Sequence, residues 1–124
     1  MRKTVLDVGN CQPDHSAIRQ MLTRHFDVRV LQCDELSDAM QILNSESIDL
    51  VLINRKLDKD YSDGIDVLKG LKADSRFASI PMMLITNYSE VQDEAVEIGA
   101  IRGFGKLSLS SEETLNRLSG VLAP

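Results

Sequence analysis

Short apolar runs alternate along the chain with longer segments in which hydrophobic residues recur every three or four positions. The runs predict five strands, at about residues 4–8, 28–31, 49–53, 80–86 and 101–104. Residues 49–53 and 80–86 are almost continuously apolar, which is typical of central strands buried on both faces. Pro81 lies near the start of its run, where a strand tolerates the missing backbone donor.

The segments that follow these runs predict helices. Helical spacing covers about residues 14–25, 36–43, 65–71, 89–98 and 110–122. Ser89-x-x-Gln92 and Ser110-x-x-Glu113 match the capping-box pattern at two of the helix starts, and Gly99 stands where a helix C-cap belongs. His25 continues the apolar stripe of the first helix, so we expect it to pack there.

Five strand–helix units in succession predict an α/β fold. Right-handed crossovers between the units lead to a doubly wound, mainly parallel sheet with helices on both faces. The 124 residues suffice for one compact domain, residues 1–124, and not for two independent cores. In such sheets ligands bind beyond the carboxyl ends of the strands, near the switch in strand order. The loops at 9–14, 54–63, 86–89 and 105–110 are therefore the predicted functional region.

Composition and charge exclude several classes of function. The chain has 14 Lys and Arg against 19 Asp and Glu, a net charge of −5, which is a poor match for nucleic acid or an anionic membrane. No apolar run approaches the length of a membrane span, and only Val5 and Leu6 separate the basic N-terminus from Asp7, which leaves no signal-peptide core. Cys11 and Cys33 match no metal spacing and favour a reducing, cytoplasmic location, although a disulfide between them stays open.

The predicted functional loops together resemble those of one family. Five short motifs fall in the order and spacing of a receiver domain, the CheY-like module of two-component response regulators: residues 49–53, Asp63-Gly64, Ile85-Thr86, Gly99-Ala100 and Phe104-x-Lys106. The resemblance covers about residues 3–122. It implies a flavodoxin-like sheet with strand order 2-1-3-4-5, five helices, and a role in phosphorelay signal transduction.

In a receiver, an acidic pair after the first strand helps to hold Mg²⁺, and an Asp at the end of the third strand accepts phosphate from a histidine kinase. A Ser or Thr ends the fourth strand, and a Lys follows the fifth. The resemblance places Thr86 at the hydroxyl position, Lys106 at the lysine position and Phe104 at the aromatic switch position. These three are the switch and pocket residues that the resemblance implies.

The remaining key positions depart from the family. The acidic pair falls on Gly9 and Asn10, and a shift by one residue gives Asn10 and Cys11, still without an acid. The phosphoacceptor position falls on Asn54. The loop over residues 54–64 is also longer than usual. These departures affect the residues on which receiver chemistry depends.

Aspartyl phosphorylation needs a carboxylate nucleophile and a divalent cation that offsets charge on the transferred group. Asn54 is neutral and a far weaker nucleophile. The acids that attract Mg²⁺ are absent from the matched positions, which leaves Lys106 as their one charge. We therefore predict a degenerate receiver that is not phosphorylated at the usual site and is not an enzyme, with weak or absent Mg²⁺ binding and no other cofactor.

Charged residues of the long loop allow two interpretations. Asp58, Asp60 and Asp63 could bind a cation or accept phosphate, but they stand among turn-forming residues, which favours a solvated turn. Arg55 and Lys56 directly follow the acceptor position. They could make the pocket prefer a phosphate or carboxylate, or they could simply flank the loop.

Four further side chains have open roles. Asp7 lies within the first strand, where the family is apolar; it could reach a basic partner, or the alignment could be off by one. Asp14 more simply caps the first helix than binds a metal. Lys106 could pair with Asn54 or with a bound anion, or could lie at the surface. Phe104 fits the core better than a switch if no phosphate arrives.

The leading functional prediction is a receiver-like signalling module that acts through protein–protein contact. Its partner would be a histidine kinase, a fused or separate output domain, or a second copy bound through residues 88–122. That face carries six acids, which suit a basic partner but also fit an ordinary solvated surface: Glu90, Asp93, Glu94, Glu97, Glu112 and Glu113. The alternative is a sensor that binds a small anion or ligand in the emptied pocket. An enzyme is least supported, because no Ser-His-Asp or paired-carboxylate set converges at the strand ends.

Overall fold

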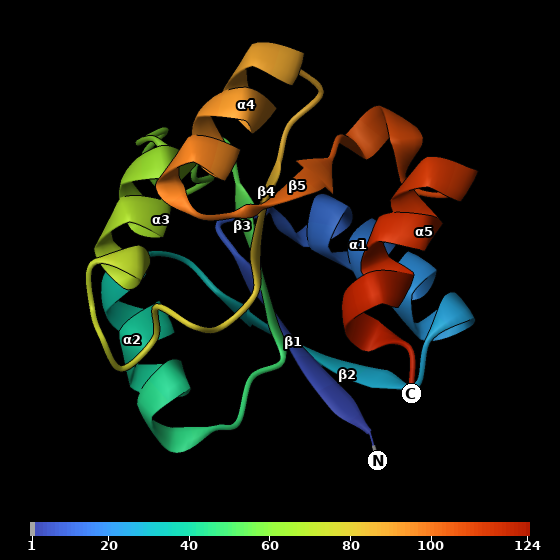
Figure 1. The fold of residues 1–124 in the computed structure, drawn as a ribbon, viewed down its shortest axis with the longest axis horizontal. Coiled ribbons are helices and arrows are strands. Elements are labelled where there is room, and N and C mark those ends of the chain that lie inside the picture. The colour runs from blue at the N-terminus through green and yellow to red at the C-terminus, as the bar shows by residue number, and fades with distance from the viewer. Residues whose placement is uncertain (1) are drawn as a thin grey trace.

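The computed structural model describes residues 2–124, which form one parallel sheet between two layers of helices (Figure 1). The strands are β1 (Lys3–Val8), β2 (Val28–Cys33), β3 (Leu50–Asn54), β4 (Met82–Ile85) and β5 (Ile101–Phe104). The helices are α1 (Gln12–His25), α2 (Leu36–Ser45), α3 (Gly64–Lys72), α4 (Ser89–Ile98) and α5 (Glu112–Leu122), with a short 3₁₀ helix, η1 (Lys106–Ser108), before α5. The strand order is β2-β1-β3-β4-β5 and all neighbours are parallel, so the predicted fold and strand order are confirmed.

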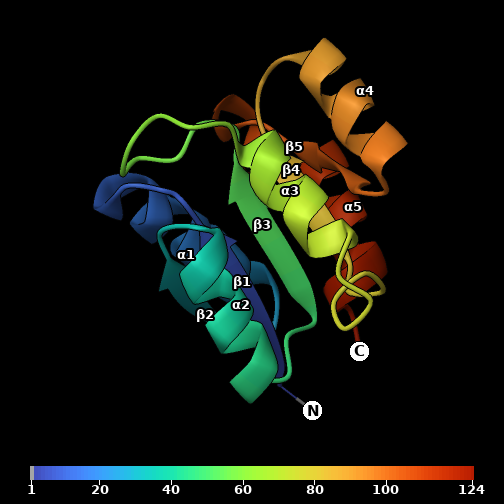
Figure 2. The same cartoon turned by 90° about the vertical axis from the view of Figure 1, so that its left-hand side faces the viewer.

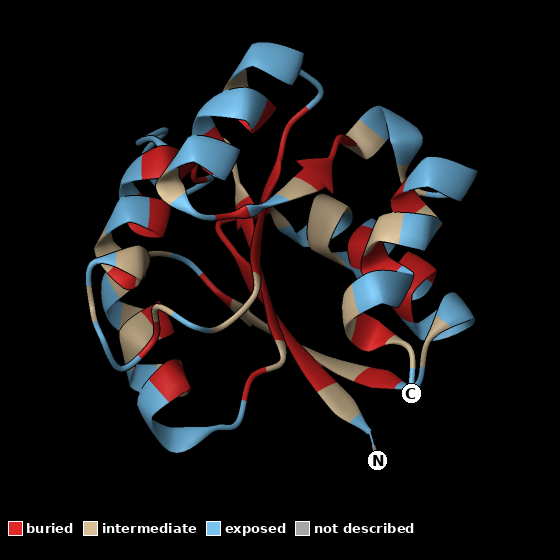
Figure 3. Ribbon diagram, viewed as in Figure 1, coloured by how far each residue is buried: buried red, intermediate tan, exposed pale blue. Residues whose placement is uncertain are grey.

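The helices divide between the two faces of the sheet. Helices α2, α3 and α4 cover one face and α1 and α5 cover the other, as two perpendicular views show (Figures 1 and 2). The central strand β3 contributes to both cores: Val51 and Ile53 lie under α2, α3 and α4, and Leu50 and Leu52 lie under α1 and α5. These side chains are fully buried, which explains the unbroken apolar run in the sequence. Figure 3 shows that most of the sheet is buried, whereas the outer faces of the helices are exposed.

Helix α1 ends at His25 as predicted, but its start and the environment of His25 differ from the prediction. It begins at Gln12, earlier than expected, because Pro13 fits the first turn of a helix. Asp14 therefore lies inside the first turn, and the expectation that it caps the helix is wrong. At the other end His25 is exposed rather than packed. The chain turns into extended backbone there, and the half-buried Phe26 packs against the core in its place.

Two capping predictions concern the start of α5 and the end of α4. Helix α5 is capped by Ser111, whose hydroxyl accepts a hydrogen bond from the Thr114 backbone N–H at 3.2 Å. The capping box predicted from Ser110 is therefore wrong by one residue. Gly99 ends α4 in the left-handed conformation, with a φ of 119°, and this C-cap prediction is confirmed.

The capping box predicted at Ser89-x-x-Gln92 is wrong, because the Gln92 side chain bonds to the sheet. Gln92 is 4% exposed, and its Nε2 donates to the carbonyl oxygens of Leu84 (3.0 Å) and Thr86 (3.2 Å). Its Oε1 accepts from the Gly103 N–H at 2.8 Å. These contacts lie where the register between β4 and β5 shifts, and a Cβ at Gly103 would lie 2.2 Å from the Leu84 oxygen. Gln92 thus joins helix α4 to both strands.

Gln92→Ala is expected to lower the free energy of unfolding by roughly 2–4 kcal/mol, because it leaves buried polar groups of two strands without partners. Urea unfolding measures the loss. Glu94→Ala, an exposed change on the same helix, is the matched control and should stay within about 0.5 kcal/mol of the parent. Equal effects of the two substitutions would show that Gln92 does not hold β4 and β5 together.

Candidate functional site

Asn54, at the phosphoacceptor position, is the half-buried last residue of β3. Its side-chain Nδ2 donates to the Lys56 carbonyl oxygen at 2.7 Å and more weakly to the Gly9 carbonyl oxygen at 3.4 Å. Because both partners are acceptors, the amide nitrogen must face them. A carboxylate in the same orientation would face two carbonyl oxygens with no proton to offer. Asn54 therefore holds the loop after β3 against the end of β1.

Gly9, at the first acidic position, leaves β1 with a φ of +85°, a conformation that favours glycine. A Cβ here would lie 2.3 Å from Cδ2 of Leu57, a side chain that is 3% exposed. The backbone N–H of Asp58 donates to the Gly9 carbonyl oxygen at 2.9 Å. The long loop thus folds over the end of β1 and fills the space that an acidic side chain at this position would need.

Asn10, at the second acidic position, belongs to a buried polar cluster around Asp7 of β1. Its Nδ2 donates to Asp7 Oδ1 at 2.5 Å, and Nδ1 of His15 on α1 lies 2.7 Å from Asp7 Oδ2. Asp7 is fully buried, and this burial raises the pKa of its carboxyl group, while the bonds from His15 and Asn10 act in the opposite direction. Of the alternatives for Asp7, the structure shows contact with a basic side chain, His15.

Lys106 also bonds to helix α1. Its Nζ donates to Oδ2 of Asp14 at 2.7 Å, across 92 positions of sequence. This bond holds the pKa of the Asp14 carboxyl group below its usual value. Within the described residues, Asp14 rather than Asn54 is the hydrogen-bond partner of Lys106. Sequence reasoning missed this role of Asp14, because no local pattern links the first turn of α1 to the loop after β5.

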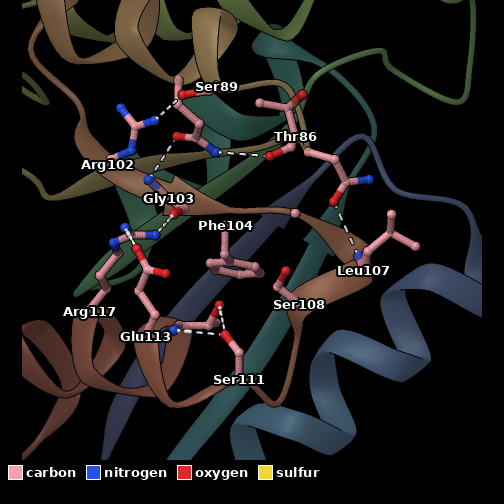
Figure 4. A pocket seen from close by; sticks show the side chains of 14 residues that line it. Thr86, Ser89, Arg102, Gly103, Phe104, Leu107, Ser108, Ser111, Glu113 and Arg117 are labelled. Atoms are coloured by element: carbon pink, nitrogen blue, oxygen red, sulfur yellow. Dashed lines mark hydrogen bonds and ion pairs between the residues drawn. The ribbon is translucent and has the colours of Figure 1, made fainter.

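Thr86 and Phe104 lie where the resemblance implies, at the ends of β4 and β5. Thr86 is 7% exposed, and its hydroxyl oxygen accepts from the Tyr88 backbone N–H at 3.1 Å. Phe104 is 3% exposed and belongs to the core under α1 and α5. Figure 4 shows its ring on the side of β5 where Ser108 and Ser111 lie. Both side chains therefore have fixed neighbours in this structure.

A polar groove of about 320 Å³ lies over β5 between α4 and α5 (Figure 4). Arg102 bonds to Asp93 of α4 at 2.6 Å and to Ser89 Oγ at 2.8 Å. On the other side Arg117 pairs with Glu113 and donates to the backbone of β5. Part of the acidity predicted for residues 88–122 is therefore neutralised within the face itself.

A second cavity, of about 290 Å³, opens at the ends of β3 and β4. Its walls bring together five residues of the predicted site, Asn54, Arg55, Lys56, Thr86 and Lys106, with Ile85, Asn87 and Tyr88. Phe104, also predicted for the pocket, lines the groove between α4 and α5 instead. Three of the residues that line the second cavity are cations, and no acid is among them. The guanidinium of Arg55 lies 5.0 Å from the centre of the Tyr88 ring. Arg55 and Lys56, separate from Lys106 in sequence, thus share one cavity with it, which we call the β3–β4 cavity.

The acids of the long loop lie outside the β3–β4 cavity and are exposed. Asp60 accepts bonds from the backbone and hydroxyl of Ser62, as expected of a turn, and Asp63 pairs with Lys56. Among residues 2–124, no group of three His, Cys, Asp or Glu side chains is arranged to hold a metal ion. The acidic-pair positions supply none of the carboxylates that Mg²⁺ prefers, because Gly9 has no side chain and the Asn10 side chain is a neutral, buried amide.

The cysteines are both free thiols in the structure. Cys11, at the start of α1, is half-buried, and Cys33, at the end of β2, is buried. Burial raises the pKa of the Cys33 thiol, which makes it a poor nucleophile. In the part of the chain that the structure describes, no helix is long and apolar enough to cross a membrane.

Comparison with known structures supports the same fold. A protein of Chloroflexus aurantiacus described as a response regulator superposes with a TM-score of 0.82 at 17% identity, covering 100% of both chains. The receiver domain of the Francisella response regulator 1452 gives a TM-score of 0.78 at 18% identity, covering 97% of this chain and 96% of that one. A chemotaxis response regulator of Vibrio cholerae gives 0.74 at 17% identity, covering 98% and 100%. At these identities the likeness establishes the fold alone.

Comparison by sequence gives the family. No curated protein matches the chain. The model of the response regulator receiver domain matches residues 12–113, which span helix α1 to the start of α5. Receiver domains act in two-component signalling, in which they contact kinases and output domains. The chain belongs to the response regulator receiver domain family.

Proposed function

We propose that this receiver works without phosphorylation at position 54, as a binding module whose partner surface is held in one conformation. The observation that carries the proposal is the orientation of Asn54, whose amide donates to the carbonyl oxygens of Lys56 and Gly9. A neutral amide is a far weaker nucleophile than a carboxylate, and its nitrogen, the atom turned toward these oxygens, cannot bind a metal ion. Leu57 supports the same conclusion, because it fills the space beside Gly9 where an acidic side chain would lie.

Basic side chains of the chain itself contact the carboxylates near this site. Asp7 lies against His15, and Asp14 lies against Lys106, each at 2.7 Å. Both pairs connect helix α1 to a strand or to the loop that follows one. With its nearby carboxylates already paired, the site offers no group of free acids to attract Mg²⁺. We therefore propose that Mg²⁺ binding here is weak or absent.

The loops that would move in a phosphorylation switch are connected to each other. The side-chain Oδ1 of Asn87, after β4, accepts from the Leu107 backbone N–H at 3.2 Å, after β5. The Thr86 hydroxyl accepts from the backbone of Tyr88, the N-cap residue of α4, and Gln92 ties that helix to β4 and β5. These contacts favour one arrangement of α4 and β5, available to a partner without a phosphoryl group.

The exposed surface of α4 and β5 indicates the chemistry of that partner. Glu90, Glu94 and Glu97 are exposed on α4. Val96 and Ile101, on the helix and on the start of β5, remain 44% and 41% exposed. A kinase, an output domain or a second copy that presents basic residues around an apolar contact would match this surface.

Intact-mass measurement after incubation with acetyl phosphate and Mg²⁺ tests the proposal. We expect no increase by the mass of a phosphoryl group, because no carboxylate is placed to attack. A receiver with the usual acids, treated in parallel, is the positive control for the phosphodonor. A stable adduct that disappears on substitution of one loop acid, such as Asp58→Asn, would contradict the proposal.

Asn54→Asp is expected to destabilise the fold rather than restore phosphorylation. The new carboxylate would face two carbonyl oxygens, so the free energy of unfolding near neutral pH should fall by roughly 1–3 kcal/mol. Urea unfolding measures the loss, and Asn116→Asp, at an exposed position of α5, is the control with the same change of charge. A stable Asn54→Asp protein that accepts phosphate from acetyl phosphate would show that the amide orientation does not decide the chemistry.

Removal of His15 is expected to make stability strongly pH-dependent. The pKa of Asp7 is raised by burial, so proton binding favours the folded state and ionisation above the folded pKa removes stability. His15→Ala leaves that buried charge unpaired and should cost about 3 kcal/mol near neutral pH. The loss should shrink as the pH falls through the folded pKa of Asp7 toward its unfolded value of about 3.9.

Urea unfolding at several pH values measures this effect, with the exposed His25→Ala as the matched control. Asp7→Leu combined with His15→Leu removes both charges and should recover most of the stability. A deficit in His15→Ala that is the same at every pH would mean that lost packing, rather than the unpaired Asp7 carboxylate, causes it.

A further inference from the structure

We propose that the β3–β4 cavity is a metal-independent site for a small phosphate monoester, bound without covalent transfer. The inference goes beyond partner binding and does not depend on it. It starts from the charge of the cavity wall, which contains Arg55, Lys56 and Lys106 and no acidic side chain. A cleft whose charged side chains are all of one sign concentrates ligands of the opposite charge.

The three cations are free for a ligand to different degrees. Lys56 pairs with Asp63, and Lys106 pairs with Asp14, but in both pairs the carboxylate lies outside the cavity lining. All four side chains are partly exposed, and ion pairs of this kind are weak enough for a bound anion to compete. Arg55 forms no ion pair with any residue in the range 2–124. Its guanidinium lies over the Tyr88 ring, 5.0 Å from the ring centre. Because its five N–H donors have no carboxylate partner, Arg55 is expected to attract an oxyanion more strongly than the two paired lysines.

Neutral donors complete the wall at the end of β4. The Thr86 hydroxyl accepts one bond and keeps its proton for a ligand. The Asn87 side chain uses its oxygen to accept from Leu107, which leaves its NH₂ group as a donor. Helix α4 begins directly after these residues, and the side chain of its N-cap residue, Tyr88, makes no capping bond. The first backbone N–H groups of α4 therefore add to the positive potential.

Size and shape favour a phosphate monoester over a bare ion. A cavity of about 290 Å³ is larger than a phosphate group alone would fill. Tyr88 lines it and is 53% exposed, so its ring can contact the organic part of a ligand. A phosphate monoester carries close to two negative charges and three acceptor oxygens near neutral pH, which matches cations and neutral donors placed on several sides. Side chains supply the positive charge, so no metal ion is needed.

The test is a titration of the ¹⁵N-labelled full chain, followed by heteronuclear NMR, without Mg²⁺ and at constant ionic strength. Inorganic phosphate, O-phosphoserine and acetate are the probes. We expect saturable shifts at Asn54, Arg55 and Asn87 with both phosphate probes, and small, unsaturated shifts with acetate. Tighter binding of O-phosphoserine than of inorganic phosphate supports the proposal, because it shows that the site also contacts the organic part of a monoester.

Arg55→Gln should weaken phosphate binding about tenfold, because it removes charge-assisted hydrogen bonds. Lys69→Gln, an exposed cation on α3 without an ion pair in the described chain, loses the same charge and should bind within about twofold of the parent. Lys106→Gln is the second variant, and its loss of affinity tests the site even if the Arg55 variant does not fold.

Four results would overturn the proposal. They are shifts that stay linear with concentration, equal losses in Arg55→Gln and Lys69→Gln, acetate binding as tight as phosphate binding, and inorganic phosphate binding as tight as that of O-phosphoserine. The outcome is independent of the mass measurement, since that experiment detects a covalent adduct and this one detects reversible binding. Failure of one proposal therefore leaves the other standing.

Discussion

The hydrogen bonds from the Asn54 amide to the carbonyl oxygens of Lys56 and Gly9 turn the loop after β3 back over the end of β1. That turn places Leu57 against Gly9, where a Cβ would have no room. It also brings Arg55 and Lys56 to the wall of the β3–β4 cavity. The loop after β3 thus both closes the space beside Gly9 and supplies two of the three cations of the β3–β4 cavity.

The positions matched to the receiver acids carry no acid, and the carboxylates of the site lie at other positions, beside basic side chains. One carboxylate of the site, Asp7, is buried within β1 and lies against His15. A buried ion pair contributes little net stability, because desolvation opposes the attraction, but breaking one partner is costly. His15 and Lys106 therefore constrain helix α1 without a metal ion.

The sequence predicts the fold well because the fold depends on patterns that are local. The continuous apolar run of β3 follows from burial on both faces, and Gly99 ends α4 because its backbone is left-handed. The site is less predictable. Lys106 meets Asp14 across 92 positions, and no spacing rule links them. Gln92 fits a capping-box pattern, yet its side chain forms hydrogen bonds to the sheet where the register between β4 and β5 shifts.

The two cavities share Thr86 and Asn87, which connects anion binding to the partner surface. The oxygen of Asn87 holds the Leu107 backbone beside the groove between α4 and α5, and its nitrogen is the donor that we assign to the anion. An anion that reorients this amide must break or strengthen the bond to Leu107. By linkage, a partner that binds one orientation of Asn87 more tightly must change anion affinity by the same factor. An anion with equal affinity for both orientations would shift nothing, so the Asn87 amide is the group on which any regulation through this cavity depends.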